Sequence, residues 1–142
     1  MADTAYKLPM VGGCQCGGVR YEVTGTPGTL YACHCRECHK LTASAFSMSL
    51  MVRYADFRVT QGAPKTWSRP TDKGNVLRCQ FCPGCGSRLW HETSGDDEWM
   101  TLKPGSLDEP VNFTVAVHIW TKRKMPGFEI PTGAKQFAGE PE

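Results

Sequence analysis

Alternation of apolar and polar residues recurs along the chain and predicts short β-strands. The longest alternating stretches are residues 19–23, 45–52, 98–102 and 112–120, and shorter ones lie at 30–32, 56–60, 65–68, 76–81 and 89–91. A side-chain period of two is typical of a strand with one buried face. Residues 39–44 are expected to form a helical turn or two. The pattern therefore predicts an all-β fold of short antiparallel strands.

Glycine and proline divide these stretches from one another. The clearest hairpin signal is Asp72-Lys73-Gly74-Asn75, between two predicted strands. Asp and Asn tolerate unusual backbone angles beside a glycine, so this tetrapeptide suits a tight turn. Neither a repeat nor an interdomain linker is recognisable. We expect a flexible leader over residues 1–11, one folded domain over 12–137 and a short tail over 138–142.

Charge and hydropathy narrow the class of protein. The 142 residues include 16 Lys and Arg against 14 Asp and Glu, a net charge of +2. This balance argues against a protein built chiefly to hold nucleic acid. No stretch approaches the ~20 apolar residues of a membrane span, and the N-terminus lacks the basic start and apolar segment of a signal peptide. A soluble, cytoplasmic protein is expected.

Eight cysteines are the most distinctive part of the composition. They occur as Cys-x-Cys, Cys-x-Cys-x-x-Cys and Cys-x-x-Cys-x-x-Cys. Disulfides are rare in the cytosol, and sulfurs this close together suit metal chelation better than bridges between strands. The spacing favours zinc over disulfides, spare thiols or an iron–sulfur cluster.

Eight sulfurs could fill two closed four-cysteine sites, or one closed site and one open site. Structural zinc sites are closed, whereas catalytic ones keep a position for water or substrate. Cys33, Cys35 and Cys38 lie within six residues and form a local three-sulfur group. Spacing alone leaves the pairing of the remaining cysteines open.

Three cysteine motifs occur in an order that resembles a known family. They are Gly13-Cys-x-Cys-Gly17, Cys33-His-Cys-x-x-Cys38 and Phe81-Cys-x-x-Cys-Gly-Ser87, and the likeness extends to the segments 105–110 and 118–120. In this combination the chain resembles the glutathione-dependent formaldehyde-activating family, which also contains centromere protein V. The likeness covers nearly all of residues 12–137.

The resemblance implies a single-domain β-tent fold with two zinc ions. It implies a structural zinc on Cys14, Cys16, Cys82 and Cys85, and a catalytic zinc on Cys33, Cys35 and Cys38. The family's type reaction joins glutathione and formaldehyde into S-hydroxymethylglutathione, formally a carbon–sulfur lyase acting in reverse. Glutathione, or another small thiol, is thus the implied partner.

The residues suit that chemistry. A thiol with a pKa of about 8.5 is mostly protonated at neutral pH, and zinc at an open position favours its thiolate form. Three thiolate ligands make zinc a poor Lewis acid, so the ion should gather thiolate more than polarise a carbonyl. We therefore expect a zinc-dependent carbon–sulfur lyase-type enzyme. The alternative is a non-enzymatic zinc module that binds protein or nucleic acid.

Several other side chains have a functional and a structural interpretation. Cys79 could be a fourth ligand of the second zinc, but a buried side chain on a strand is the favoured interpretation. His34 and His118 are expected to be hydrogen-bonded core or supporting residues. We expect surface positions for most of the cationic side chains, namely Arg36, Lys40, Arg69 and Lys122–Lys124. We expect core positions for most of the tryptophans, namely Trp67, Trp90, Trp99 and Trp120.

Overall fold

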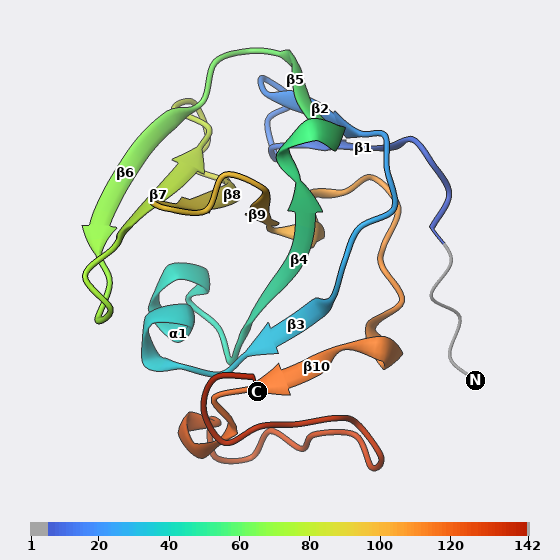
Figure 1. Ribbon diagram of the computed structural model, residues 1–142. Coiled ribbons are helices and arrows are strands. Elements are labelled where there is room, and N and C mark those ends of the chain that lie inside the picture. Colours follow the sequence, from blue (N-terminus) through green and yellow to red (C-terminus); the bar gives the residue numbers. More distant parts are fainter. Residues whose placement is uncertain (1–5, 142) are drawn as a thin grey trace. The chain divides into compact units, whose positions relative to one another are not determined.

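Short strands make up most of the regular structure in the computed structural model, which describes residues 6–141 (Figure 1). The strands are β1 (Met10–Gly13), β2 (Arg20–Val23), β3 (Leu30–Cys33), β4 (Ser47–Arg53), β5 (Phe57–Gln61), β6 (Lys65–Pro70), β7 (Val76–Phe81), β8 (Arg88–Thr93), β9 (Trp99–Leu102) and β10 (Val117–Ile119). The one α-helix in the described part is α1 (Arg36–Thr42). Single 3₁₀ turns lie at Tyr54–Asp56, Pro104–Ser106, Phe113–Val115 and Thr121–Arg123. The prediction of an all-β fold built from short strands is confirmed.

The described chain divides into two compact units. The larger unit contains residues 6–28 and 50–111, and the smaller unit contains residues 29–49 and 112–141. Strand β1 starts at Met10, two residues before the expected start of the folded domain. Residues 1–5 of the expected leader lie outside the described part of the chain.

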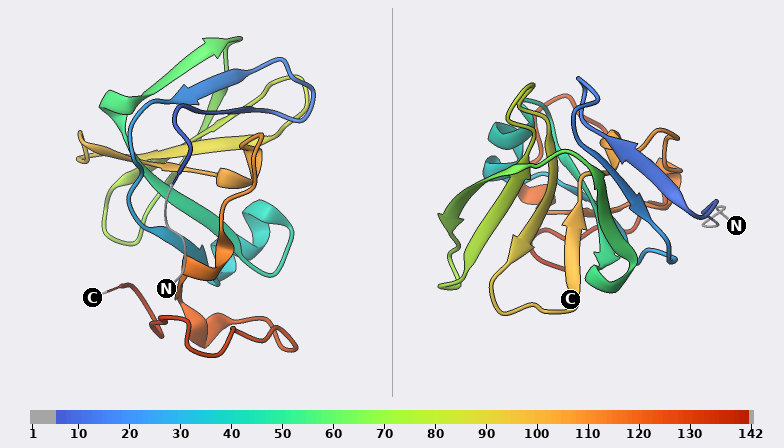
Figure 2. Two further views of the ribbon diagram at one scale, coloured as in Figure 1. Left: turned by 90° about the vertical axis from the view of Figure 1, so that its right-hand side faces the viewer. Right: turned by 90° about the horizontal axis from the view of Figure 1, so that it is seen from above.

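Antiparallel pairing organises the larger unit. One sheet has the order β1-β2-β5. In the other, residues 50–53 of β4 pair with β9, which is followed by β8, β7 and β6. Figure 2 shows β6 and β7 running side by side in opposite directions. The predicted hairpin turn joins them, with Gly74 at φ 85° and the Thr71 N–H donating to the Asn75 carbonyl at 2.8 Å.

Alternating strand residues supply the core of the larger unit. On β2, Tyr21 and Val23 are buried while Arg20 and Glu22 are partly exposed. The fully buried apolar side chains of this unit include Leu50, Val52, Leu89, Met100 and Leu102. The hydroxyl group of the buried Tyr21 forms a hydrogen bond with that of Ser106, with the two oxygens 2.6 Å apart. Burial raises the pKa of Tyr21 to about 12, and the hydrogen bond with Ser106 opposes this shift only in part.

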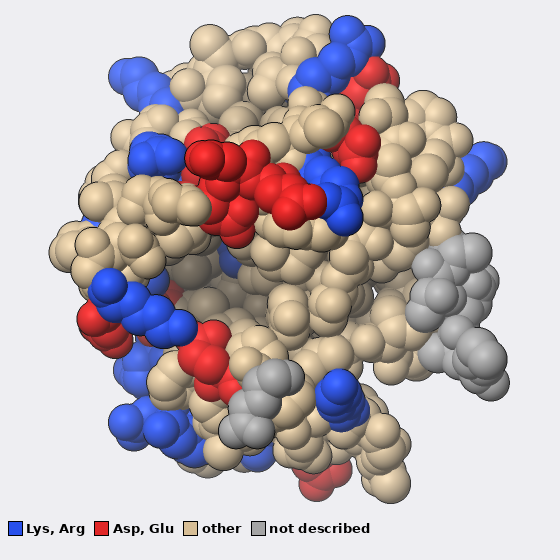
Figure 3. Space-filling model, viewed as in Figure 1, with Lys and Arg blue, Asp and Glu red and all other residues tan. Residues whose placement is uncertain are grey.

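Ion pairs join side chains of opposite charge on the surface of the larger unit. On the face drawn in Figure 3, Lys and Arg side chains lie among Asp and Glu side chains. In the larger unit, the Arg20 guanidinium grips both carboxylate oxygens of Asp108, at 2.9 and 2.5 Å. Arg53 pairs with Glu98, and Arg58 pairs with Glu22. No helix in residues 6–141 has the length and apolar character needed to span a bilayer.

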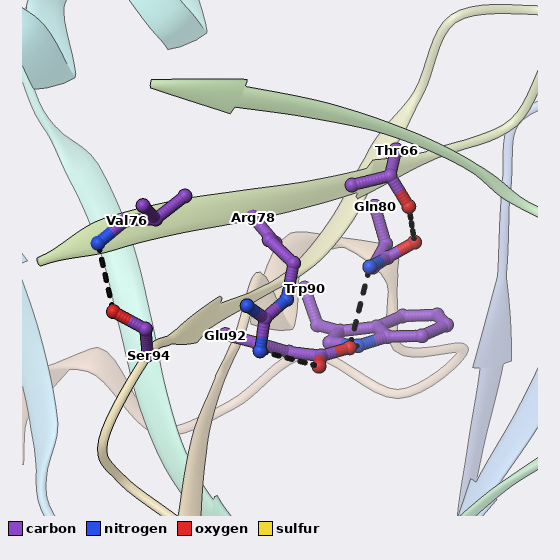
Figure 4. Close-up of polar contacts among 7 residues, drawn as sticks. All are labelled: Thr66, Val76, Arg78, Gln80, Trp90, Glu92 and Ser94. Carbon is purple, nitrogen blue, oxygen red and sulfur yellow. Dashed lines mark hydrogen bonds and ion pairs between the residues drawn. The ribbon is translucent and has the colours of Figure 1, made fainter. Parts of the chain in front are cut away.

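A polar network joins strands β6, β7 and β8 on one face of their sheet (Figure 4). The Thr66 hydroxyl donates to the Gln80 side-chain oxygen at 2.8 Å. Glu92 accepts from the Trp90 indole N–H at 2.8 Å and from the Gln80 amide at 3.3 Å. Arg78 lies 3.9 Å from the other carboxylate oxygen of Glu92. One carboxylate therefore satisfies two donors from neighbouring strands.

A parallel strand pair and the helix form the regular part of the smaller unit. Strand β10 pairs in parallel with β3, so that His118 lies opposite Ala32 and Ile119 opposite Cys33. The helix starts at Arg36, three residues earlier than the predicted helical stretch, because Cys35 caps it. It ends at Thr42, and the following residue, Ala43, adopts the left-handed conformation at φ 51°.

Residues 112–120 form less strand than their alternation predicts. Only Val117–Ile119 are extended and paired, and Phe113–Val115 form a 3₁₀ turn. The Asn112 side chain explains the difference, because it accepts from the Thr114 backbone N–H at 3.1 Å and so starts the turn. Trp120, at φ 56°, ends the strand.

Candidate metal centres

Four cysteines of the larger unit converge from two distant segments. Cys14 and Cys16 follow β1, whereas Cys82 and Cys85 follow β7. All four sulfurs lie within 4.8 Å of one another. The Cys16 sulfur is 3.6 Å from that of Cys14 and 3.7 Å from that of Cys82. These are the four residues for which the family resemblance implies a structural zinc.

Tight backbone turns bring these sulfurs together. After β7, the Gly86 N–H donates to the Cys82 carbonyl at 2.8 Å, and Gly86 has a φ of 79° that a residue with a Cβ rarely adopts. Backbone N–H groups also point at the sulfurs. The Val19 N–H lies 3.2 Å from the Cys14 sulfur, and the Gly84 N–H lies 3.3 Å from that of Cys82. Such donors stabilise thiolates over thiols.

The remaining three-cysteine cluster lies within the smaller unit. Its members are Cys33 at the end of β3, Cys35 at the N-cap of α1 and Cys38 in the first turn. Their sulfurs also lie within 4.8 Å of one another. Two backbone contacts hold the segment in place: the Cys38 N–H points at the Cys35 sulfur at 3.3 Å, and the His34 N–H donates to the Ile119 carbonyl at 3.0 Å.

Hydrogen bonds among the three thiols concentrate negative charge on one of them. The thiols of Cys33 and Cys38 stabilise a thiolate on Cys35 and lower its pKa to about 2. The Cys35 partner in turn raises the pKa of Cys33 to about 11. Cys33, Cys35 and burial together raise the pKa of Cys38. Without a cation the cluster favours a single negative charge, so full ionisation of all three sulfurs requires a bound cation.

In the four-cysteine cluster, too, the pKa values of neighbouring thiols are shifted in opposite directions. The hydroxyl and backbone of Ser87 lower the pKa of Cys85 to about 5. The Gly18 backbone N–H favours the thiolate of Cys16, yet the neighbouring thiols outweigh it and raise the pKa of Cys16 to about 11. A cation bound among the four sulfurs would stabilise the thiolate form of all four.

Both donor sets fit zinc. A tetrahedral ion with Zn–S bonds of about 2.3 Å separates its sulfurs by roughly 3.8 Å, close to the 3.6 and 3.7 Å contacts of the four-cysteine cluster. All eight cysteines carry free thiols. Within residues 6–141, no His, Asp or Glu joins either cluster. One donor set thus has the four sulfurs of a closed site, and the other has three, which leaves a coordination position to be filled.

His34 lies between two of these cysteines but forms part of an aromatic core. It is fully buried, and its Nε2 lies 2.9 Å from Nδ1 of His118, itself 1% exposed. The rings of Phe46 and Phe128 have centroids 5.6 and 5.2 Å from the His34 ring. Burial, followed by the charge of His118, lowers the pKa of His34 to about 4. The ring therefore stays neutral at neutral pH and braces the segment that carries Cys33 and Cys35.

His39 is a residue that the sequence analysis did not single out. It follows Cys38 in α1 and is 6% exposed. The Arg36 guanidinium lies 2.9 Å from its Nδ1. Its position directly after Cys38 could have marked it as a candidate site residue. Its burial could not be seen in the sequence, because it depends on where the helix starts.

Cys79 belongs to neither cluster. It is 1% exposed on β7, opposite Trp67 on β6 and His91 on β8. Burial raises the pKa of its thiol. This environment agrees with the favoured interpretation of Cys79 as a packed side chain.

The other candidate side chains differ in exposure. Trp90 is buried and contacts Phe57 at a centroid distance of 4.8 Å, whereas Trp67 is 50% exposed beside Arg88. Trp99 and Trp120 are half-buried. Among the cations, Lys40, Lys122 and Arg123 are exposed, Arg69 is half-buried, and Lys124 donates to the Phe128 carbonyl.

Known proteins resemble the chain in family and in fold. A search of curated proteins found no match. A crystal structure of a Rhodobacter sphaeroides protein, a structural genomics target, is similar at 26% sequence identity with a TM-score of 0.58, covering 72% of this chain and 91% of that chain. The profile of the glutathione-dependent formaldehyde-activating enzyme family matches residues 9–123. Both cysteine clusters lie inside the matched region, and the chain belongs to the glutathione-dependent formaldehyde-activating enzyme family.

Proposed function

We propose that this protein is a zinc-dependent carbon–sulfur lyase-type enzyme that joins glutathione to formaldehyde and cleaves the same adduct. The observation that carries the proposal is the three-cysteine cluster, which offers three sulfurs and, among the described residues, no fourth ligand. A site of this kind leaves a position for an exogenous thiol. The family description, a glutathione-dependent formaldehyde-activating enzyme, supplies the two substrates.

Zinc held by Cys33, Cys35 and Cys38 would supply the positive charge that favours the thiolate form of a thiol beside it. In the reaction the thiol sulfur forms a bond to the formaldehyde carbon. The electron pair of the carbonyl π bond moves to oxygen, and that oxygen takes up the proton released by the thiol. The product is a hydroxymethyl thioether, so atoms and charge balance without an oxidant or a reductant.

The protein's own residues fix the geometry of this site. Pairing of β3 with β10 positions Cys33, and the N-cap and first turn of α1 position Cys35 and Cys38. The half-buried rings of Phe46 and Phe128 pack against the buried His34, which lies between Cys33 and Cys35. A site held by a strand end and a helix start is more rigid than one on a loop.

The four-cysteine cluster has a structural role in this proposal. It takes a second zinc ion, on Cys14, Cys16, Cys82 and Cys85, whose closed set of sulfurs leaves no position for substrate. The chain then carries two zinc ions. Eight free thiols suit the reducing cytoplasm, where we place the enzyme.

The test compares two cysteine variants with the wild-type protein. Wild type should contain two zinc ions, form the hydroxymethyl adduct from glutathione and formaldehyde, and, with cobalt in place of zinc, show a charge-transfer band that glutathione changes. Cys38→Ser should remain folded with one zinc and lose both adduct formation and the glutathione response. Cys79→Ser is the matched control and should keep both.

Two outcomes would contradict the proposal. A cobalt spectrum that ignores every small thiol offered would show that the second site is closed. Loss of the three-cysteine metal in Cys79→Ser would assign Cys79 as its fourth ligand and make both ions structural.

A further inference from the structure

The tautomer of His39 is fixed by its neighbour. The Arg36 Nη1 atom lies 2.9 Å from His39 Nδ1. A guanidinium only donates hydrogen bonds, so Nδ1 must present its lone pair. The proton of the neutral imidazole is therefore on Nε2. His39 thus carries a hydrogen-bond donor whose position is set by the helix.

That donor has no acceptor. The Nε2 atom is buried and has no hydrogen-bond partner among the residues that the structure describes. The whole side chain is only 6% exposed. Buried donors are nearly always paired, and an unpaired one that survives in a well-packed region indicates a ligand or a bound water. An acceptor on a ligand or a bound water would satisfy this donor.

His39 belongs to the same segment of the chain as the three cysteines. His39 follows Cys38 directly, and both belong to α1. A second buried nitrogen without a partner, Nδ1 of His34, comes from the same segment. Within residues 6–141, these two are the buried side-chain nitrogen or oxygen atoms without a partner. Their confinement to residues 33–39 argues against chance packing defects.

We propose that His39 donates a hydrogen bond from Nε2 to the oxygen of the aldehyde, and of the hydroxymethyl group formed from it, at the three-cysteine site. The inference rests on the proposed function and names a residue that positions the substrate oxygen. As the carbon–sulfur bond forms, the carbonyl oxygen gains negative charge, which a fixed donor stabilises. A zinc already surrounded by three thiolates has little charge left to offer that oxygen.

The first test measures the tautomer. Long-range ¹H–¹⁵N NMR spectra of the zinc-loaded full-length protein report which imidazole nitrogen carries the proton. We expect His39 to be protonated on Nε2, and Arg36→Met to yield a mixture of tautomers. A His39 ring protonated on Nδ1 in the wild-type protein would overturn the inference, whatever the enzyme's activity.

The second test uses a pair of variants at the same position. Gln places an amide N–H near the position of Nε2, whereas Phe keeps a ring and has no donor. Removing a donor of this kind typically lowers the rate by about 10²–10³-fold. We expect that loss in adduct formation for His39→Phe and a loss of less than about tenfold for His39→Gln. Zinc content and the cobalt band with glutathione should be unchanged in both.

The outcomes separate this inference from the proposed function. If wild type makes no adduct from glutathione and formaldehyde, the proposed function is wrong. The aldehyde oxygen is then also wrong as the acceptor of the His39 hydrogen bond. If wild type is active and His39→Phe is equally active, only the inference is overturned. Should His39→Phe not fold, Arg36→Met decides the question: it should bind glutathione normally and form adduct several-fold more slowly, and a wild-type rate would overturn the inference.

Discussion

The buried side chain of His91 makes the stability of the larger unit depend on pH. It is 4% exposed, and its Nε2 accepts from the Arg88 guanidinium at 3.2 Å. Burial, followed by the positive charges of Lys103, Arg88 and Arg69, lowers its pKa from 6.5 to about 3. The folded protein therefore needs a neutral His91, while the unfolded chain protonates it near its ordinary pKa.

This difference predicts a pH-dependent stability. Between pH 6.5 and 3 the unfolded chain binds the extra proton, so the free energy of unfolding should fall as pH falls, by up to about 1.4 kcal/mol per pH unit. Above pH 6.5 the contribution is constant. Denaturant unfolding of wild type and His91→Gln at pH 7 and pH 5 measures it.

His91→Gln should lose less stability than wild type over that interval, because Gln keeps an acceptor for Arg88 and does not titrate. Both proteins contain the same cysteine clusters, so the contribution of cysteine protonation to the free energy of unfolding is removed when the two losses are subtracted. Equal losses would show that His91 is not the group responsible.

At the scale of elements, Glu92 links three strands through a single side chain. The carboxylate accepts from Trp90 on its own strand and from Gln80 on β7, and Gln80 in turn accepts from Thr66 on β6 (Figure 4). Glu92 is the one acidic residue within strands β6 to β9. A network whose members are all satisfied stabilises, whereas a half-satisfied one costs stability.

Glu92→Leu should therefore destabilise the larger unit by about 1–3 kcal/mol, because the buried Trp90 indole N–H and the Gln80 amide lose their acceptor. Glu92→Gln keeps one oxygen acceptor and should cost less. Chemical denaturation followed by tryptophan fluorescence measures both. If the two variants were equally stable, the network would have no energetic role.

The four-cysteine cluster joins elements that are far apart in the sequence. Its zinc would link the end of β1 to the end of β7, and structural zinc contributes on the order of 10 kcal/mol to small domains, comparable to a whole domain's stability. We expect Cys82→Ser to be unfolded or insoluble. Soluble yield, zinc content and far-ultraviolet circular dichroism measure this, and a soluble variant with an unchanged melting temperature would contradict the assigned ligand set.

At the scale of the whole molecule, the charge distribution predicts weak binding to nucleic acid. The net charge is +2, and both signs are interspersed on the face shown in Figure 3. Few phosphates could be contacted at once, so any DNA affinity should fall steeply between about 50 and 200 mM salt. Fluorescence anisotropy with a labelled duplex measures it. Tight, salt-resistant binding would favour the non-enzymatic zinc module.

The parts of the site that depend on local spacing were predictable from sequence. Cys33, Cys35 and Cys38 are close in the chain, so any compact backbone brings their sulfurs together. The burial of His39 was not predictable, because it depends on a helix that starts at Arg36, three residues before the helical stretch that the sequence indicates.

Long-range pairing limited the prediction of the fold in the same way. The alternation over 112–120 did not reveal the Asn112 cap, which starts the 3₁₀ turn at Phe113–Val115. Nor does alternation specify direction, so the parallel pairing of β10 with β3 emerged only from the structure. The strands of the larger unit were more predictable because most are joined to their partners by short turns.

The separation of the four cluster cysteines along the chain has a consequence for biosynthesis. Cys82 comes 66 residues after Cys16, which corresponds to roughly 3–13 s of translation at ~5–20 residues per second. During that interval Cys33, Cys35 and Cys38 have already left the ribosome as a complete donor set, while Cys14 and Cys16 wait for their partners. A zinc ion bound by the nascent chain would therefore meet the sulfurs of Cys33, Cys35 and Cys38 before the four-sulfur set exists, whereas β10, the strand that pairs with β3, follows later still, at Val117–Ile119.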